Sequence, residues 1–226
     1  MSTISDRLGV AGTFAYANWP TTLHTFEMTK HVINKKIPGV LVECGVGAGS
    51  QIGAMALACE ELNHVRPIYA FDSYEGIPMA SEKDDCQPGV GYFATPKEFV
   101  SDKRSLLVSS GVSSHSLEAV RLTLSTKLLI SLDNIKFIKG WFQDTLETVS
   151  KEIESIAILR LDGDLYESTK VCIEHLFDKL SPGGILIIDD WVLKGCRAAC
   201  DEYLDYKKLS KLKTIPGSAV VWFVKK

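Results

Sequence analysis

Two short aliphatic runs, each ending in a pair of carboxylates, constrain the fold of this chain more than any other feature. The first run is Ile158-Ala-Ile-Leu-Arg-Leu-Asp162-Gly-Asp164, and the second is Gly184-Ile-Leu-Ile-Ile188, followed by Asp189-Asp190. Continuous aliphatic runs are typical of strands buried in a parallel sheet, where ligands bind at the carboxyl ends of the strands. We therefore expect these four acids to meet at one edge of a sheet.

The rest of the chain alternates apolar runs with segments of helical periodicity. Further strands are expected at 40–43, 68–71, 134–139, 212–215 and 219–224, and helices at 21–34, 52–62, 95–107, 116–129, 145–153, 166–180 and 195–209. The last two strands flank a Pro216-Gly217 turn, which favours an antiparallel hairpin. This order predicts an α/β fold with a doubly wound, mostly parallel seven-stranded sheet that ends in an antiparallel C-terminal hairpin.

The length of 226 residues fits one domain, with appendages at two places. Residues 1–36 are predicted to form an N-terminal arm and helix, of which 1–20 are irregular. The main domain is then expected to span 37–226. Residues 79–133 are too long for a simple crossover, so we expect an inserted lid or oligomer-forming segment there. Its amphipathic pattern leaves open a homodimer or a higher homo-oligomer.

Composition narrows the classes of partner. Charged residues make up 23% of the chain and the net charge is −3, so no basic excess points to nucleic acid. No apolar run is long enough to span a membrane, and the start lacks the pattern of an export signal. The six cysteines include no Cys-x-x-Cys pair, which favours reduced thiols. We expect a cytoplasmic protein that acts on a small molecule.

A glycine-rich loop follows the first predicted strand. Its pattern is Glu43-x-Gly45-x-Gly47-x-Gly49, and Ser50 then opens a helix. The spacing fits the dinucleotide fingerprint poorly, and it has the form found in S-adenosylmethionine-dependent methyltransferases. Glycines at such a turn let backbone approach a ligand closely, so we expect the loop and Ser50 to contact this cofactor.

An acid stands at the end of the second predicted strand. Asp72 is placed to accept hydrogen bonds from both ribose hydroxyls of a nucleoside, with Ser73 beside it. The alternative for this pair is an Asx-type turn, which is common. After the third strand, Trp141 and Phe142 follow Gly140, where they could close the core or sandwich an adenine ring.

The acids themselves predict a metal site. Asp162, Asp189 and Asp190 are hard oxygen ligands with no histidine or cysteine beside them, which favours Mg²⁺ or Mn²⁺ over zinc. Two roles are equally open for Asp164. It could act in catalysis, or it could be a charge at the N-terminus of a helix, three residues before Glu167 in the spacing of a capping box.

Several longer motifs together carry a family resemblance that runs from about Ile37 to Tyr203. They are Pro38-Gly-Val-Leu-Val-Glu43-Cys-Gly-Val, Phe71-Asp-Ser-Tyr-Glu-Gly-Ile-Pro78, Gly91-Tyr-Phe93, Lys139-Gly-Trp-Phe-Gln-Asp-Thr145, Leu159-Arg-Leu-Asp-Gly-Asp-Leu-Tyr-Glu-Ser-Thr169, Ser181-Pro-Gly-Gly184 through Asp189-Asp190, and Gly195-Cys-Arg197. With these motifs the chain resembles the macrocin O-methyltransferase family, which methylates sugar hydroxyls of antibiotics with S-adenosylmethionine and magnesium.

The resemblance implies a class I, Rossmann-like O-methyltransferase and assigns roles to the residues above. Glu43, the loop glycines, Asp72 and Ser73 would bind the cofactor, and Asp162, Asp189 and Asp190 would bind Mg²⁺. The proton of the acceptor hydroxyl would pass to Asp164 or to a metal ligand such as Asp162. The alternatives are a related metal-dependent enzyme on the same scaffold and a non-catalytic cofactor-binding subunit.

Overall fold

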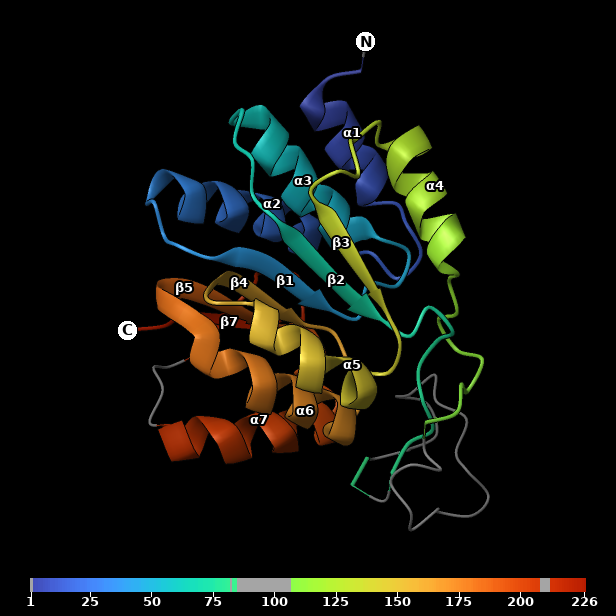
Figure 1. Cartoon of the computed structure of the whole chain (residues 1–226), viewed down its shortest axis with the longest axis vertical. Coiled ribbons are helices and arrows are strands. Elements are labelled where there is room, and N and C mark those ends of the chain that lie inside the picture. The colour runs from blue at the N-terminus through green and yellow to red at the C-terminus, as the bar shows by residue number, and fades with distance from the viewer. Residues whose placement is uncertain (1, 82, 85–106, 208–211) are drawn as a thin grey trace.

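A twisted sheet of seven strands forms the centre of the molecule, in the order β3-β2-β1-β4-β5-β7-β6 (Figure 1). The computed structural model describes residues 2–81, 83–84, 107–207 and 212–226. Strands β1 to β5 run parallel, whereas β7 runs antiparallel to both β5 and β6. The strands are β1 (Val40–Cys44), β2 (Ile68–Asp72), β3 (Ile135–Lys139), β4 (Ile156–Leu161), β5 (Leu180–Ile188), β6 (Lys213–Thr214) and β7 (Val221–Val224). The predicted fold class is confirmed.

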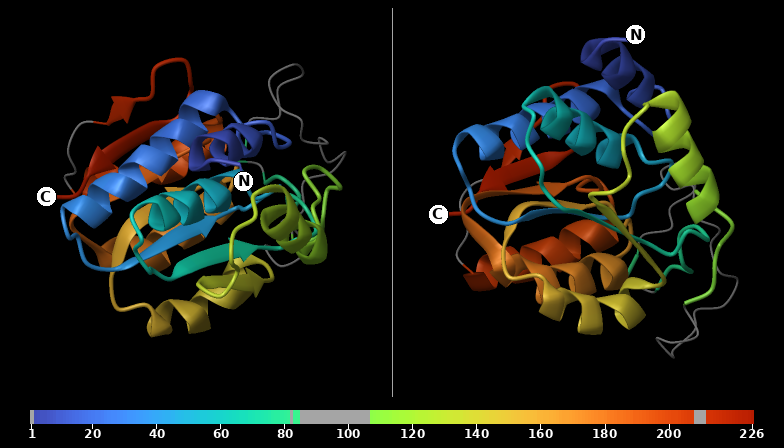
Figure 2. Two further views of the ribbon diagram at one scale, coloured as in Figure 1. Left: turned by 90° about the horizontal axis from the view of Figure 1, so that it is seen from above. Right: turned by 45° about the horizontal axis from the view of Figure 1, so that its top comes forward.

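Helices cover both faces of the sheet (Figure 2). One face carries α1 (Ile4–Ala11), α2 (Trp19–Asn34) and α3 (Ser50–Glu61), and α4 (Leu117–Lys127) joins the same core. The other face carries α5 (Phe142–Val149), α6 (Tyr166–Leu176) and α7 (Lys194–Lys207). Because side chains of a strand alternate between faces, Leu41 of β1 belongs to the first core and its neighbour Val42 to the second. The central strand β1 is thus buried on both sides.

Residues 4–11 and 19–20 are helical, so the expectation of an irregular segment over 1–20 is wrong there, although 12–18 are non-helical. Thr3 caps α1 in a capping box, in which its hydroxyl accepts from the Asp6 N–H and the Asp6 carboxylate accepts from the Thr3 N–H. Arg7 then pairs with Glu60 of α3. Asn18 caps α2, which therefore begins at Trp19 rather than at residue 21. Both helices pack on α3 beside the sheet.

Of the predicted inserted segment at 79–133, residues 79–81, 83–84 and 107–133 lie within the described residues. The N–H of Ile77 donates to the Val112 carbonyl, 3.0 Å away, and the N–H of Ser110 donates to the Ile77 carbonyl at 2.8 Å. The second predicted helix is present as α4. Nearly all of the predicted helix at 95–107, together with the Gly91-Tyr-Phe93 motif, lies outside the described residues.

Other predicted boundaries also differ from the structure. The Ser181-Pro-Gly-Gly184 segment, which separates the predicted helix at 166–180 from the predicted strand, lies inside β5, because Leu180 pairs with Ile156 before the register of β4 and β5 shifts. Helix α5 begins at Phe142, three residues before its predicted start at residue 145. The described cysteines, Cys44, Cys59, Cys172, Cys196 and Cys200, are free and buried. No helix among the described residues is long and apolar enough to cross a membrane.

Candidate active site

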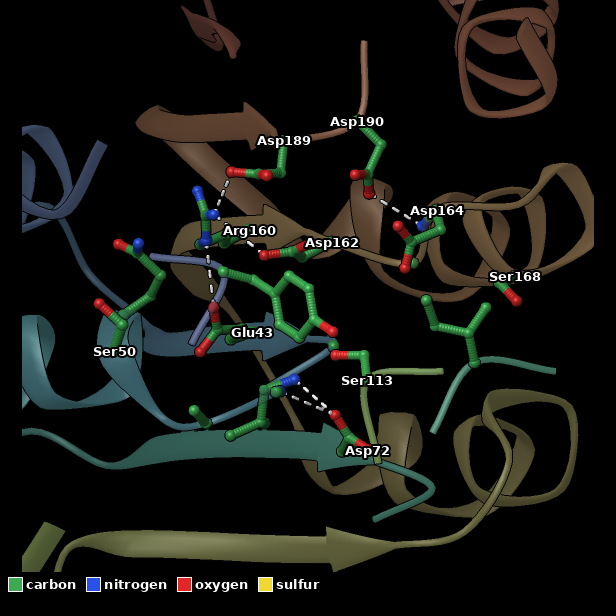
Figure 3. Close-up of a pocket in the computed structure, with 18 of the residues that line it drawn as sticks. Glu43, Ser50, Asp72, Ser113, Arg160, Asp162, Asp164, Ser168, Asp189 and Asp190 are labelled. Atoms are coloured by element: carbon green, nitrogen blue, oxygen red, sulfur yellow. Dashed lines mark hydrogen bonds and ion pairs between the residues drawn. The ribbon is translucent and has the colours of Figure 1, made fainter. Parts of the chain in front are cut away.

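A pocket of about 410 Å³ opens at the carboxyl ends of the parallel strands (Figure 3). Its wall contains the glycine loop after β1, the acid at the end of β2 and the acids after β4 and β5. The connection between α1 and α2 and the turn between β6 and β7 complete the rim. The predicted cofactor half and the predicted acid half therefore share one cavity.

The glycines of the loop have different tasks. A Cβ atom at Gly45 would lie 1.7 Å from the Asp162 carbonyl oxygen, so this glycine lets the chain after β1 pass the chain after β4. Gly49 has a φ of 92° and its Cβ position faces Val120 of α4. At Gly47, with a φ of 51°, a Cβ atom would meet nothing within 4 Å. Gly47 is thus the glycine that presents bare backbone to open space in the pocket.

Asp72 organises that loop (Figure 3). Its Oδ2 accepts from the N–H of Val46 at 2.7 Å and of Gly47 at 3.1 Å, and its Oδ1 accepts from the N–H of Tyr74 at 2.6 Å. The last bond is the Asx-type turn that was the alternative, so Asp72 makes this turn while lining the pocket. The Ser73 hydroxyl also lies 3.5 Å from Oδ1, but its one hydrogen is closer to the Gly76 carbonyl at 2.8 Å, so Oδ1 keeps capacity to accept from a ligand. Burial raises the pKa of Asp72, and these hydrogen bonds oppose that rise.

Two serines expected at the cofactor use their hydroxyls within the protein. The Ser73 hydroxyl donates to the Gly76 carbonyl at 2.8 Å, and the Ser50 hydroxyl donates to the Ala11 carbonyl at 2.9 Å. Both residues nevertheless line the pocket. Their side chains hold the turn after β2 and the junction of α1 with α3.

The residues after β3 lie beside Asp72. The N–H of Gly140 donates to the Asp72 carbonyl at 2.9 Å, which holds the end of β3 against β2. Trp141 and Phe142 both line the pocket. Phe142 also packs into the core beside the sheet, so its ring closes the core and borders the cavity at once.

Arg160 is the central residue that sequence reasoning missed. Its side chain is 2% exposed, and its Nε donates to Glu43 Oε1 at 3.1 Å. Its Nη2 donates to Asp162 Oδ2 at 3.0 Å and also to Asp189 Oδ1. Glu43 and Arg160 are register partners on β1 and β4. One charged residue within an aliphatic strand was the available signal, because a buried guanidinium requires acidic partners.

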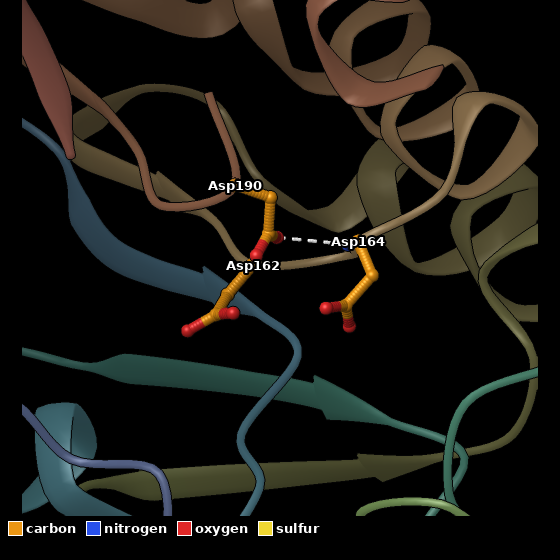
Figure 4. A group of neighbouring side chains, drawn as sticks. All are labelled: Asp162, Asp164 and Asp190. Atoms are coloured by element: carbon orange, nitrogen blue, oxygen red, sulfur yellow. Dashed lines mark hydrogen bonds between the residues drawn. The ribbon is translucent and has the colours of Figure 1, made fainter. Parts of the chain in front are cut away.

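The carboxylates of Asp162, Asp164 and Asp190 lie close together and are called the acid group below (Figure 4). One oxygen of each lies within 4.8 Å of the others, and the N–H of Asp164 donates to Asp190 Oδ2 at 2.8 Å. Among the described residues, no other set of three histidine, cysteine or acidic side chains lies close enough to hold a metal ion. The predicted metal ligands were Asp162, Asp189 and Asp190. In the structure Asp164 lies in the group instead of Asp189, whose carboxylate contacts Arg160.

The position of Asp164 argues against a mere helix-start charge. Its φ is 59°, a left-handed value that aspartate tolerates better than most residues other than glycine. The cap residue of α6 is Leu165, and no side chain accepts as its cap. Asp164 is directed into the acid group by the turn that precedes α6 (Figure 4).

The acid group is short of positive charge. Desolvation by burial and repulsion from neighbouring carboxylates raise the pKa of Asp162, Asp164 and Asp190 well above the usual aspartate value. Desolvation likewise raises the pKa of Glu43 to about 8, although Arg160 opposes the shift. Hard oxygen donors that repel one another suit a divalent cation such as Mg²⁺. The residues present therefore fit the predicted metal.

Two further pocket residues other than glycine have left-handed backbone. Tyr16, between α1 and α2, has a φ of 62° and is 69% exposed, and Ser113, before α4, has a φ of 53°. Both line the pocket. The Tyr16 ring meets the His115 ring edge-on, with centroids 6.4 Å apart. Strain thus occurs at two places on the rim, and no sequence pattern indicated it.

Comparison with known proteins gives matches along nearly the whole chain. A family model described as Macrocin-O-methyltransferase (TylF) matches residues 21–224. The chain is 34% identical over 217 residues to 8-demethyl-8-(2,3-dimethoxy-alpha-L-rhamnosyl)-tetracenomycin-C 4'-O-methyltransferase of Streptomyces olivaceus, with 91% of this chain and 77% of that protein covered. It is 32% identical over 219 residues to demethyldecarbamoylnovobiocin O-methyltransferase of Streptomyces niveus, with the same coverage.

Solved structures agree with these matches. The structure of the O-methyltransferase NovP superposes with a TM-score of 0.77 at 29% identity, over 94% of this chain and 82% of that one. The calicheamicin methyltransferase CalS11 shares the fold at 19% identity, with a TM-score of 0.67 over 98% and 90% of the two chains.

Proposed function

The chain belongs to the macrocin-O-methyltransferase family, and on that premise we propose that it methylates a sugar hydroxyl of a glycosylated metabolite with S-adenosylmethionine and a divalent cation. The family and its relatives make it an S-adenosylmethionine-dependent O-methyltransferase. The names of the relatives include a rhamnosyl tetracenomycin, a novobiocin precursor and a mycinamicin, which supports a sugar-bearing acceptor. The observation that carries the proposal is the single pocket that contains both Gly47 and the acid group.

The cofactor half consists of the glycine loop, Ser50, Asp72, Ser73 and the Gly140-Trp141-Phe142 segment. Gly47 leaves room for close approach, Asp72 keeps an acceptor position for a ribose hydroxyl, and Trp141 offers an apolar surface to the base.

Three buried polar atoms support the placement of the amino-acid end of the cofactor. Glu43 Oε2, Gln51 Oε1 and Arg160 Nη1 have no hydrogen-bond partner among the described residues, and all three residues line the pocket. Buried polar atoms of this kind are costly unless a ligand or water pairs with them. Two acceptors and one cationic donor match the ammonium and carboxylate groups of a methionine moiety.

The acid half is assigned to the acceptor. Asp162, Asp189 and Asp190 would hold Mg²⁺, and Asp162 and Asp190 already lie together in the group of Figure 4. A bound Mg²⁺ lowers the pKa of a hydroxyl that it contacts and fixes its orientation. Asp164 is the residue that takes the hydroxyl proton, because its carboxylate lies with Asp162 and Asp190 and is not one of the three proposed ligands. Asp162 contributes to catalysis by fixing the acceptor.

Calorimetry with S-adenosylhomocysteine, with and without MgCl₂, tests the cofactor half. Incubation of demethyldecarbamoylnovobiocin with S-adenosylmethionine, followed by mass spectrometry, tests one acceptor of the proposed class. Asp164→Asn is expected to keep S-adenosylhomocysteine affinity and to lose methyl transfer. If the cofactor product does not bind under either condition, the proposed function is wrong.

A further inference from the structure

Arg160 stands between the cofactor half and the acid half of the pocket. Its Nε faces Glu43 at the cofactor end, while its Nη2 is shared by Asp162 and Asp189 at the acid end (Figure 3). It is therefore the resident positive charge of a network that contains five carboxylates: Glu43, Asp162, Asp164, Asp189 and Asp190.

The partners of Arg160 differ in freedom. The Arg160 and Glu43 side chains are 2% and 1% exposed, whereas those of Asp162 and Asp189 are 29% and 28% exposed. The guanidinium is therefore fixed by the surrounding strands, and Asp189 has solvent beside it into which its carboxylate can turn. Of the four aspartates, Asp189 is the one absent from the group whose oxygens lie within 4.8 Å of one another.

We infer that Arg160 is a positioning residue that competes with the divalent cation for the carboxylate of Asp189. This inference rests on the proposed cation site. In the structure Arg160 holds Oδ1 of Asp189, so a cation that recruits Asp189 draws on a carboxylate whose charge and orientation the guanidinium already engages. Arg160 thus weakens the binding of the free cation and offsets the mutual repulsion of the acids when no cation is bound.

The chemistry of the two cations makes the competition physically reasonable. Both a guanidinium and a divalent ion bind carboxylate oxygens, and a carboxylate held by one is less available to the other. A guanidinium a few ångströms from a divalent ion also repels it, and this repulsion acts whether or not Asp189 is present. An experiment must therefore separate the two contributions.

A Mn²⁺ titration, followed by loss of the free-ion EPR signal in the absence of cofactor, makes that separation. Arg160→Gln is expected to bind Mn²⁺ about tenfold more tightly than the unaltered protein. In the background of Asp189→Asn, the same Arg160→Gln change is expected to tighten Mn²⁺ binding by only about threefold, because one of the two carboxylates that Arg160 holds is gone while Asp162 and the through-space repulsion remain.

Three results overturn the inference. Mn²⁺ affinity that is unchanged or weaker in Arg160→Gln would mean that Arg160 does not compete with the cation. Equal tightening by Arg160→Gln in the unaltered chain and in the Asp189→Asn background would assign the effect to Asp162 and through-space repulsion, with no part for Asp189. Loss of Mn²⁺ binding in all variants and in the unaltered protein, with S-adenosylhomocysteine still bound, would overturn the cation half of the proposed function as well.

A second variant covers the case in which Arg160→Gln does not fold, as judged by circular dichroism. Arg160→Lys keeps the charge, but one ammonium group cannot reproduce the fork that contacts Glu43 and Asp189 together. Competition through Asp189 predicts Mn²⁺ binding about threefold tighter in Arg160→Lys, whereas through-space repulsion predicts no change. Failure of S-adenosylhomocysteine to bind any variant or the unaltered protein would contradict the proposed cofactor, while the Mn²⁺ comparison would still decide the competition.

Discussion

The carboxylate of Asp72 can be tested by replacing it with the amide of the same shape. Asp72→Asn leaves one oxygen to accept hydrogen bonds, so the new NH₂ group must face either the Tyr74 N–H or the two N–H groups of the loop. The better orientation keeps Val46 and Gly47 as donors and leaves Tyr74 without its acceptor. The substitution therefore removes the hydrogen bond from Tyr74, and it makes the acceptor of the bonds from Val46 and Gly47 neutral instead of negatively charged.

The expected loss follows from these three bonds. A hydrogen bond to a charged acceptor contributes about 1.5–3 kcal/mol, and the loss of charge weakens each of the other two by about 1 kcal/mol. Removing a buried charge offsets part of this, because burial already raises the pKa of Asp72. We expect the free energy of unfolding to fall by about 2–3 kcal/mol.

Urea unfolding followed by circular dichroism, at neutral pH without cofactor, measures this loss. The matched control is Asp133→Asn, the same change at an exposed site where the carboxylate accepts from Ser131 at 2.7 Å; a loss within about 0.5 kcal/mol is expected there. If Asp72→Asn lowers the free energy of unfolding by no more than Asp133→Asn does, the glycine loop does not depend on this carboxylate and the reasoning is refuted.

Three other perturbations address Tyr16 on the pocket rim, the buried charge of Glu43, and Asp84 in the predicted inserted segment. Tyr16→Asn should raise the free energy of unfolding by about 0.5 kcal/mol, because asparagine tolerates a left-handed φ. Urea unfolding measures the gain, and the control Val65→Asn, at another exposed site, should show none. A gain at both sites would contradict the strain at Tyr16. Burial raises the folded-state pKa of Glu43 to about 8, so the folded protein keeps this proton at pH values where the unfolded chain loses it. The free energy of unfolding of the cation-free protein should therefore fall as the pH rises from about 4.5 to about 8. A rise over that range in urea titrations would be inconsistent with this burial. Asp84→Asn should lower the free energy of unfolding by about 1–3 kcal/mol, because Asp84 accepts from the Tyr166 N–H and from Ser81, each at 2.8 Å; unchanged thermal unfolding would show that these contacts contribute nothing.

The sheet was predictable because buried parallel strands carry a continuous aliphatic pattern that little else produces. The same pattern placed Asp72, Asp162 and Asp189 at strand ends, where the structure has them. Helix α1 was missed because glycines and aromatic residues in the first 20 positions obscured a short helix, whose evidence was the spacing of Thr3 and Asp6. Local caps are weaker signals than long apolar runs.

The arrangement of the acids was less accessible to sequence reasoning. Which carboxylates lie together depends on side-chain partners, and the sequence does not show that Arg160 faces Glu43 across two strands and holds Asp189. The left-handed turn at Asp164 accompanies its hydrogen bond to Asp190, another distant residue. Both features arise from contacts between segments far apart in the chain, which neither periodicity nor local spacing encodes.

The close passage at Gly45 changes how the glycine motif should be interpreted in other chains. A side chain at that position would collide with backbone whether or not any cofactor binds, so a protein that had lost its enzymatic role would still retain this glycine. Gly47 has no such neighbour, and a side chain there would cost the fold only the strain of a left-handed φ. In a degenerate relative, substitution at the position of Gly47 is therefore the informative sign that the methyl donor is no longer bound.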